Sequence, residues 1–454
     1  MKPESVKKVY FLGIGGIGMS ALARYLNSAG VKVSGYDKTP TTLTSELERE
    51  GMEIHYEDMP DLITPDIDLV VYTPAVPTDL GEFIRVKDSG LPLLKRSQLL
   101  ESITANHKTL AVAGTHGKTT VSTMLAHILY SSHLGCTAFL GGIAKNYNSN
   151  LLLNHQSEFM VAEADEFDRS FLRLHPELAV ITSTDADHLD IYNDHGSMLS
   201  TFAEFAGNVS RTGTLILKRG INLPLKDNPE GRKLYYYSVS DEADFRVEGL
   251  ELSGGRYQFN LRTPFGIIEG FNPVLPGLFN VENAVAASAA ALMAGAKEEE
   301  IVKAVNSFTG VRRRFDHRVN KGGVLYIDDY AHHPEELRAC ITSVRKLYPD
   351  RKITGIFQPH LYTRTRDFAE GFAESLSLLD KLILLDIYPA REKPIPGITS
   401  GMLLEITPLE DKLLLSKEGA VEYISSNKPD ILLTLGAGDI DQLVPEIERI
   451  LLKD

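Results

Sequence analysis

The chain has 454 residues, enough for about three domains at roughly 150 residues each, and 43% are hydrophobic and 24% charged, as in ordinary globular proteins. Its formal net charge of −14 argues against a broad basic surface, so we expect no nucleic-acid partner. No apolar run approaches the roughly 18–20 residues that span a bilayer, and we expect no membrane partner. The two cysteines, Cys136 and Cys340, lack metal-ligand spacing and fit a reduced, cytoplasmic location.

The first section of the chain, from Val6 to about Asn106, alternates short apolar runs with amphipathic ones. "KVYFLGIG" predicts a strand, "GMSALARYLNSAG" a helix, and "VKVSGYD" and "DIDLVVYTPAV" two further strands. This alternation is typical of a doubly wound α/β sheet. We therefore predict a Rossmann-like domain over residues 1–106.

A glycine pattern follows the first predicted strand. Gly13, Gly15 and Gly18 form G-x-G-x-x-G, with Gly16 inside it, and Asp37 ends the next predicted strand. Glycines at these places let backbone N–H groups approach a diphosphate at a helix N-terminus, and the acidic residue can bond a ribose hydroxyl. The pattern fits a nicotinamide dinucleotide and a UDP-sugar equally well. A dehydrogenase, a UDP-sugar-binding protein and a turn without ligand all remain open here.

A second section begins at "HKTLAVAGTHGKTT" and continues through the strand-like runs "SEFMVAEADEFD", "PELAVITSTDADHLD" and "TGTLILK". Four runs between residues 233 and 275 resemble short antiparallel strands, and an Ala-rich helix follows. We predict a central domain of the P-loop ATPase type over residues 107–312. The alternation restarts with "GVLYIDDYA", "HPEELRACITSVRKLY" and "KITGIFQPH", so residues 313–454 are predicted to form a second Rossmann-like α/β domain.

The second section opens with a shortened phosphate loop. The usual pattern G-x-x-x-x-G-K-[ST] places a glycine five residues before Gly117, where this chain has Val112. Backbone N–H groups and the helix dipole favour an anion there, Lys118 can neutralise the β- and γ-phosphates, and Thr119 can present its hydroxyl to Mg²⁺. We predict that ATP contacts seven loop residues: Gly114, Thr115, His116, Gly117, Lys118, Thr119 and Thr120.

Acidic clusters end the two strands that follow this loop. Mg²⁺ needs oxygen ligands, and strand ends on one sheet lie close together. Charge runs at strand ends are usually solvated loops, but two of them after a phosphate loop favour a metal site. The candidates are Glu163, Asp165, Glu166 and Asp168 in the first cluster and Asp185, Asp187, His188 and Asp190 in the second.

Taken in order, "GTHGKTT", "EADEFD", "DADHLD", "LFNVENAVAA", "GVRRRFD", "DDYAHHP" and "QPHLYTRTRD" resemble the motifs of the Mur ligases. These are the ATP-dependent amide-forming enzymes of peptidoglycan precursor synthesis, a pathway of cell-wall biogenesis. The resemblance extends over essentially the whole chain and the same three-domain order. The opening "FLGIGGIGMSALA" narrows it to the branch that joins L-alanine to the lactyl carboxylate of UDP-N-acetylmuramate through an acyl phosphate. The alternative is the branch that attaches recycled tripeptide to the same sugar nucleotide.

This resemblance implies that ATP, UDP-N-acetylmuramate and L-alanine are the partners, with Mg²⁺ or Mn²⁺ as cofactor, in a monomer or homodimer. The first glycine loop then holds a UDP-sugar, and no hydride chemistry is expected. A dehydrogenase would leave the phosphate loop unused, and a transport ATPase would leave the first loop unused. Residues of the second and third sections have to meet around ATP, so we expect opening and closing during turnover.

The resemblance also implies roles for single residues. It makes Lys118, Glu163, His188 and Arg314 catalytic, with Thr119, Glu163 and His188 as metal ligands. ATP is expected at the loop and at Asn280, Asn283, Arg314 and Asp329. The UDP-sugar is expected at Gly13, Gly15, Gly16, Gly18, Asp37 and Ser97, and the amino acid at His333, His360, Arg364 and Arg366. Helix capping is the alternative for the asparagines, and solvation of a helix start is the alternative for the "QPHLYTRTRD" residues.

One feature departs from the sister enzymes. Several of them bind metal with a carbamylated lysine some fifteen residues beyond the His of the "DHLD" motif. The corresponding stretch here, "DIYNDHGSMLSTFAEF", contains no lysine. That absence suits the alanine-adding branch. It leaves a second divalent ion, for which the resemblance implies His188 as a ligand, with fewer assigned ligands.

Overall fold

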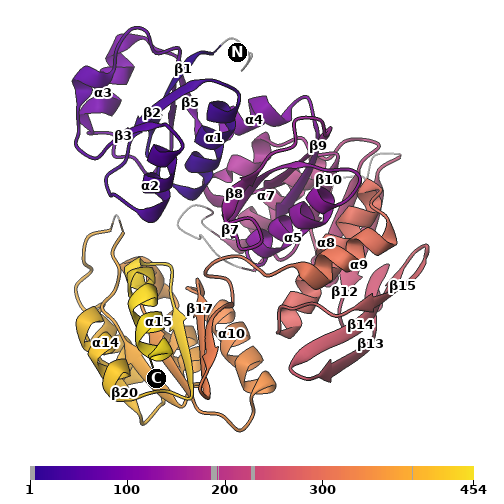
Figure 1. The fold of residues 1–454 in the computed structure, drawn as a ribbon, viewed down its shortest axis with the longest axis vertical. Helices are drawn as coiled ribbons and strands as arrows, with labels where there is room; N and C mark the ends of the chain where they lie inside the picture. The colour runs from indigo at the N-terminus through magenta and orange to yellow at the C-terminus, as the bar shows by residue number, and fades with distance from the viewer. Residues whose placement is uncertain (1–5, 186–191, 193, 226–230, 391, 454) are drawn as a thin grey trace. The chain divides into compact units, whose positions relative to one another are not determined.

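The computed structural model describes residues 6–185, 192, 194–225, 231–390 and 392–453 (Figure 1). The chain divides into two compact units. The first comprises Met1–Val274 and Val281–Thr309, and the second comprises Leu275–Asn280 and Gly310–Asp454. Within the described ranges, no helix combines the length and the apolar character needed to cross a membrane.

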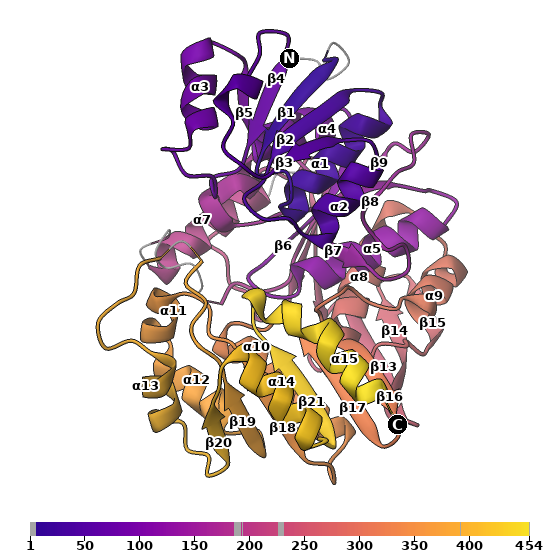
Figure 2. The same cartoon turned by 60° about the vertical axis from the view of Figure 1, so that its left-hand side comes forward.

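The N-terminal part of the first unit is a five-stranded parallel sheet in the order β3-β2-β1-β4-β5 (Figure 2). Val9 and Phe11 of β1 pack into one apolar cluster, whereas Tyr10 and Leu12 pack into another, so both faces of the sheet are covered. This alternation confirms the doubly wound sheet predicted from the sequence. The elements are β1 (Lys8–Leu12), α1 (Ile17–Ser28), β2 (Lys32–Tyr36), α2 (Thr42–Arg49), β3 (Glu53–His55), η2 (Pro60–Leu62), β4 (Leu69–Tyr72), α3 (Gly81–Ser89), β5 (Leu93–Lys95) and α4 (Arg96–Thr104).

The rest of the first unit is built on a ten-stranded mixed sheet in the order β15-β14-β13-β12-β11-β10-β6-β9-β7-β8. Small alanines on β6, β9 and β10 face a cluster of aromatic residues from α7, which lets this helix pack closely on the sheet. The strands are β6 (Lys108–Ala113), β7 (Thr137–Ala144), β8 (Ser149–Leu152), β9 (Phe159–Glu163), β10 (Leu178–Ile181), β11 (Thr214–Lys218), β12 (Lys233–Ser238), β13 (Phe245–Ser253), β14 (Arg256–Thr263) and β15 (Gly266–Phe271). The helices are α5 (Lys118–Ser131), η3 (Phe167–Arg173), α7 (His195–Gly207), α8 (Leu278–Ala294), whose first residues belong to the second unit, and α9 (Glu298–Ser307).

The prediction of four antiparallel strands between residues 233 and 275 was wrong for the first of them. Strand β12 pairs in parallel with β11, Leu215 opposite Leu234, and also in parallel with the start of β13. Among these four strands, antiparallel pairing joins β13 to β14 and β14 to β15. Short apolar runs separated by turns do not reveal strand direction, which here follows from a crossover back to the central sheet.

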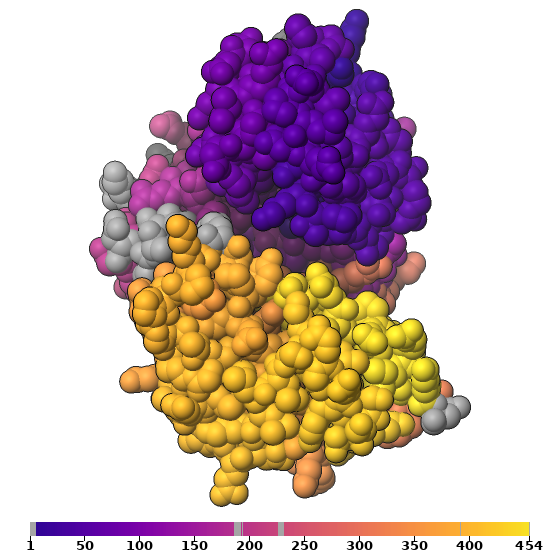
Figure 3. Space-filling view, turned by 90° about the vertical axis from the view of Figure 1, so that its left-hand side faces the viewer, coloured from indigo at the N-terminus to yellow at the C-terminus, as the bar shows by residue number. Residues whose placement is uncertain are grey.

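The second unit contains a six-stranded sheet in the order β16-β17-β21-β18-β19-β20, parallel except for β16. Apolar residues of α10, α12 and α13 cover one face, and those of α14 and α15 cover the other. Figure 3 shows the outer surface of this unit as a continuous packing of side chains in orange and yellow. The strands are β16 (Asp316–Lys321), β17 (Val324–Asp329), β18 (Ile353–Phe357), β19 (Lys381–Leu384), β20 (Lys412–Leu414) and β21 (Ile431–Leu435). The helices are α10 (Pro334–Leu347), α11 (Tyr362–Asp367), α12 (Ala369–Leu376), α13 (Ser400–Ile406), α14 (Lys417–Ser426), η4 (Asp439–Leu443) and α15 (Val444–Leu452).

Each of the three predicted sections thus contains one sheet, and the fold is the three-domain α/β arrangement expected from the sequence. The boundaries after residues 106 and 312 stay predictions. The compact units join the first two sections and assign Leu275–Asn280 to the second unit.

Candidate active site

The first glycine loop joins β1 to α1 at the carboxyl edge of the N-terminal sheet. Gly13 has a φ of +84°, which favours glycine, and its N–H donates to the carbonyl of Tyr36 over 2.8 Å. The N–H of Gly15 donates to Asp37 Oδ2 over 2.8 Å, and Gly16 is the N-cap of α1. Asp37, which we predicted to bond a ribose, therefore also closes the loop, and its binding role stays a prediction.

Arg96 is a cation at this loop that the sequence interpretation missed. A Cβ on Gly18 would lie 2.6 Å from Arg96 Nη1, so the guanidinium rests directly against the start of α1. Arg96 opens α4, in which the predicted Ser97 is the second residue. The other terminal nitrogen of Arg96, Nη2, lies 3.7 Å from Asp165 Oδ2. The basic pair in "LLKRSQLL", placed directly after a strand, was the available signal.

The second glycine loop joins β6 to α5 and is held by the end of β10. Gly117 has a φ of +82° and is the N-cap of α5, and Gly114 has a φ of +134°. A Cβ on Gly114 would come within 2.2 Å of Thr182 Oγ1, so only glycine fits. Ser183 Oγ accepts from the N–H of His116 over 2.6 Å. Thr182 and Ser183, absent from our predicted site, therefore fix the loop, and the polar end of "AVITST" was their signal.

Lys118, the first residue of α5, forms a buried ion pair with Glu166. Its Nζ lies 2.8 Å from Glu166 Oε2, and the side chains are 13% and 1% exposed. Burial alone lowers the pKa of Lys118, but the charges of Glu166, Asp165 and Glu163 outweigh it and raise that pKa. Burial raises the pKa of Glu166, and Lys118 opposes that shift. The predicted phosphate-binding lysine is thus paired with a buried acidic side chain.

Thr119 and Glu163, two of the predicted metal ligands, lie together. Thr119 Oγ1 donates to Glu163 Oε1 over 3.0 Å, from the start of α5 to the end of β9. Gly141 of β7 makes room for this carboxylate, since a Cβ there would lie 2.0 Å from Glu163 Oε2. A hydroxyl and a carboxylate are the oxygen donors that Mg²⁺ prefers, so the pair fits the ion chemically.

The third predicted ligand, His188, lies outside the described residues, as do Asp187 and Asp190. Asp185 is described, and its Oδ2 lies 3.7 Å from His116 Nε2. In the described part of the chain, no group of three or more His, Cys, Asp or Glu side chains is arranged to hold a metal ion. The predicted metal site is therefore represented by the Thr119–Glu163 pair.

The two predicted asparagines of α8 differ in their surroundings. A Cβ on Gly117 would lie 3.1 Å from Asn283 Oδ1, so Asn283 adjoins the phosphate loop. Asn280 is buried, and its Nδ2 donates to the carbonyl of Pro276 over 2.7 Å. That bond differs from helix capping, the alternative we considered, because the side chain donates to a carbonyl instead of accepting from a backbone N–H. Nucleotide contact by either residue stays a prediction.

In the second unit, Arg314 precedes β16 and Asp329 ends β17, so both lie at the open end of the β16–β17 hairpin. Asp329 accepts from the N–H groups of Phe315 and Ala331 over 2.6 and 2.7 Å, and burial raises its pKa to about 7 although Arg314 opposes the shift. The guanidinium of Arg314 lies 4.9 Å from the ring centroid of Tyr330. The open end of the hairpin therefore presents a cation from just before one strand and an acidic side chain from the end of the other.

Of the four predicted amino-acid residues of the second unit, the structure brings His360 and Arg364 together. His360 stacks on Tyr388 with 5.7 Å between centroids, and Arg364 Nη1 lies 3.5 Å from His360 Nδ1. Arg366 is half exposed and pairs instead with Asp367 over 2.7 Å. His333 is buried as the N-cap of α10, where its Nδ1 accepts from a backbone N–H. The structure thus separates Arg366 from Arg364.

Sequence comparison decides the family. Residues 8–108 match "Mur ligase family, catalytic domain", residues 112–291 match "Mur ligase middle domain", and residues 313–438 match "Mur ligase, glutamate ligase domain". A protein of Phocaeicola vulgatus named UDP-N-acetylmuramate–L-alanine ligase is 51% identical over 460 residues, covering 100% of both chains. The chain belongs to the Mur ligase family.

Other Mur ligases agree with this assignment. A Parabacteroides distasonis protein of the same name is 50% identical, covering 100% of this chain and 99% of that one. The crystal structure of the UDP-N-acetylmuramate–alanine ligase of Thermotoga maritima superimposes with a TM-score of 0.81 at 26% identity, over 98% of each chain. The murein peptide ligase of Psychrobacter arcticus shares the fold, with a TM-score of 0.72 at 22% identity over 99% of each chain.

Proposed function

We propose that this Mur ligase joins L-alanine to the lactyl carboxylate of UDP-N-acetylmuramate at the expense of ATP, in the cytoplasm. The observation that supports this most directly is the presence of two different phosphate-type glycine loops in one compact unit. One begins a Rossmann-type helix, which suits the diphosphate of a UDP-sugar, and the other begins α5 with Lys118 and Thr119, the residue types that bind the phosphates of ATP in phosphate loops. The names of the similar full-length proteins support the same reaction.

The first chemical step transfers the γ-phosphoryl group to the lactyl carboxylate. A carboxylate oxygen attacks the γ-phosphorus, the bond to the β-phosphate oxygen breaks, and ADP leaves. Several anions have to be held together for this attack, so cationic groups and backbone N–H donors supply most of the stabilisation. We assign this role to Lys118 and the loop N–H groups, and the same role toward the phosphates to Arg314.

The second step forms the amide. The amine of L-alanine attacks the acyl carbon, and the tetrahedral intermediate collapses with loss of inorganic phosphate and a proton. Arg364, next to His360, is our candidate for binding the L-alanine carboxylate, because a guanidinium can bind a carboxylate through two parallel hydrogen bonds. The raised pKa of Asp329, about 7, makes it a candidate to hold a proton near neutral pH.

The proposed metal ion is inferred from the side chains that can bind it. We propose that Mg²⁺, or Mn²⁺ in its place, binds at Thr119, Glu163 and His188. A divalent ion there supplies charge neutralisation for the phosphates. A hydrogen bond joins the side chains of Thr119 and Glu163, so the two oxygen donors are already adjacent.

The experiment is a scan of amine substrates. Purified protein is incubated with Mg·ATP and UDP-N-acetylmuramate, and phosphate release is followed with L-alanine, L-serine, glycine or the recycled tripeptide. We expect release that depends on L-alanine and a UDP-linked product heavier by one alanine residue. Release with the tripeptide alone would move the chain to the recycling branch, and no amine-dependent release would refute the proposal.

A further inference from the structure

A buried asparagine outside the predicted site joins the N-terminal sheet to the central sheet within the first unit. Asn150 of β8 is 0% exposed. Its Nδ2 donates to the carbonyl of Ile17 over 2.6 Å and to Ser20 Oγ over 2.8 Å, and its Oδ1 accepts from Arg24 Nη1 over 2.5 Å. Both amide hydrogens and the carbonyl oxygen of Asn150 are therefore bonded to one face of α1.

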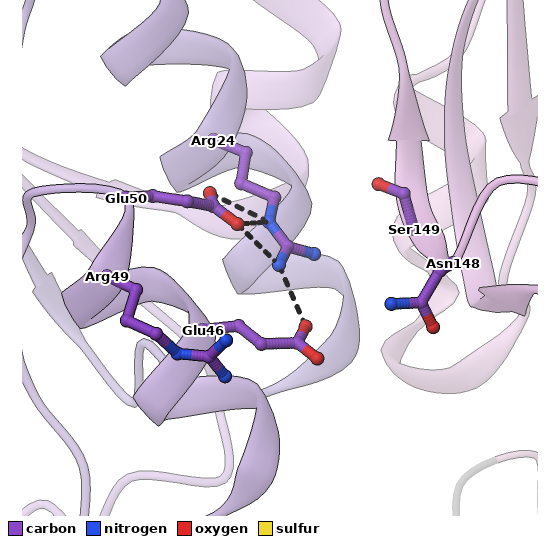
Figure 4. Close-up of a pocket in the computed structure, with 6 residues that line it drawn as sticks. All are labelled: Arg24, Glu46, Arg49, Glu50, Asn148 and Ser149. Carbon is purple, nitrogen blue, oxygen red and sulfur yellow. Dashed lines mark hydrogen bonds and ion pairs between the residues drawn. The ribbon is translucent and has the colours of Figure 1, made fainter.

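Arg24 extends this contact to α2. Its side chain is 9% exposed, its Nε and Nη2 donate to Glu50, and Nη2 also donates to Glu46 over 3.1 Å. Figure 4 shows Arg24 with these two glutamates on one side of a cavity of about 320 Å³ and Ser149 across it. The arginine is thus fixed by two carboxylates, and its remaining nitrogen, Nη1, is directed at Asn150.

The two ends of this network lead to the two glycine loops. Ile17 directly follows Gly16, so the bond from Asn150 lies at the start of α1, next to the predicted UDP-sugar loop. On the other side, β8 pairs with β7 and β7 pairs with β9, which ends at Glu163. Strand β7 also contains Gly141, against which the Glu163 carboxylate rests.

Apolar packing follows the same path. Tyr25 of α1 lies against Phe139 of β7 with 5.4 Å between ring centroids. Phe139, Leu151 and Met160 of the central sheet belong to the same apolar cluster as the residues of β1 and α1. A displacement of α1 is therefore transmitted through packed side chains to the strand next to Glu163, because a close-packed core does not absorb it.

We propose that Asn150 is a positioning residue for the ligase reaction. It fixes the register of α1 on the β7–β8 hairpin and so sets the distance between the sugar nucleotide and the ATP loop. This inference rests on the proposed function, because it needs both ligands in the first unit. Catalytic groups have to be held within roughly 0.5 Å, and a displacement of about 1 Å can cost on the order of 10²-fold in rate.

The test separates positioning from binding and from stability. Asn150→Ala removes all three bonds to α1, and Arg24→Lys keeps the charge beside the glutamates but loses the planar fork that reaches Asn150. Ser149→Ala and Arg49→Ala are matched controls at the same cavity. For each variant we measure kcat, the Kd of UDP-N-acetylmuramate alone, the Kd of a non-hydrolysable ATP analogue alone, and Tm.

We expect Asn150→Ala to lower kcat about 10- to 100-fold, with both separate Kd values within about threefold of wild type. Arg24→Lys is expected to lower kcat by a smaller factor, and the controls to stay within about twofold. A kcat within twofold of wild type in a folded Asn150→Ala variant would overturn the inference. So would a variant whose only defect is weaker binding of one of the two ligands. If Asn150→Ala does not fold, an unchanged kcat in Arg24→Lys overturns it. Failure of the wild type to form an amide contradicts the proposed function, a result distinct from these.

Discussion

Replacing Lys118 by Met is expected to destabilise the ligand-free protein as well as stop the reaction. Lys118 and Glu166 are 2.8 Å apart, and Glu166 is 1% exposed, so the substitution leaves a buried carboxylate without its cation. Breaking a buried pair in this way costs about 3–5 kcal/mol. At about 2–4 °C per kcal/mol for a domain of this size, the Tm should fall by roughly 6–20 °C.

Thermal unfolding without ligands, followed by circular dichroism, measures this effect. Lys118→Met combined with Glu166→Gln removes both charges and should regain most of the lost stability, while phosphate release stays at least about 10²-fold below wild type. Lys108→Met is the matched control, because Lys108 and Glu158 are also 2.8 Å apart but are 52% and 61% exposed. That pair should contribute about 0–1 kcal/mol. Equal Tm values for Lys118→Met and wild type would refute the reasoning.

Three further predictions have defined outcomes. Gly141→Ala should displace the Glu163 carboxylate and raise the Mg²⁺ concentration needed for half-maximal activity at least about tenfold, as a metal titration will show, and an unchanged titration would contradict the site. Arg364→Ala should raise the KM for L-alanine by a larger factor than Arg366→Ala, and equal effects would argue against separating them. Burial raises the pKa of Asp328 from 3.8 to about 6, so its contribution to stability falls as pH rises from about 4 to 6. Asp328→Asn should remove roughly 2 kcal/mol of that fall between pH 4.5 and pH 7.5, measured by denaturant unfolding at both values, and parallel pH profiles would contradict it.

Much of the fold could be predicted because its local signals agree. Runs such as "KVYFL" are apolar or aromatic at every position after the first lysine, as expected for a strand covered on both faces, and glycines mark the turns into helices. Strand direction was harder, because β12 differs from its neighbours only in what it pairs with across the sheet. Non-local pairing leaves no periodic trace in the sequence.

The candidate site was predictable where a residue lies in a motif and less so where it acts through another element. Lys118, Thr119 and Glu163 follow from the phosphate loop and the strand end, and the structure brings them together. Glu166 was noticed only as one of four acidic residues, since nothing in the sequence marks which of them is buried. Gly141 makes room for the Glu163 carboxylate, and Asn150 bonds to Arg24. Both partners are distant in sequence, so only the folded chain identifies these two residues.

The most direct test of the central claim follows oxygen atoms. UDP-N-acetylmuramate labelled with ¹⁸O in both oxygens of the lactyl carboxylate is converted with Mg·ATP and L-alanine, and the phosphate is analysed by mass spectrometry. An acyl phosphate places one carboxylate oxygen between carbon and phosphorus, and amine attack expels it with the phosphate. The account therefore predicts one ¹⁸O in each phosphate and one in the amide product. Unlabelled phosphate beside a labelled amide would contradict carboxylate activation by ATP.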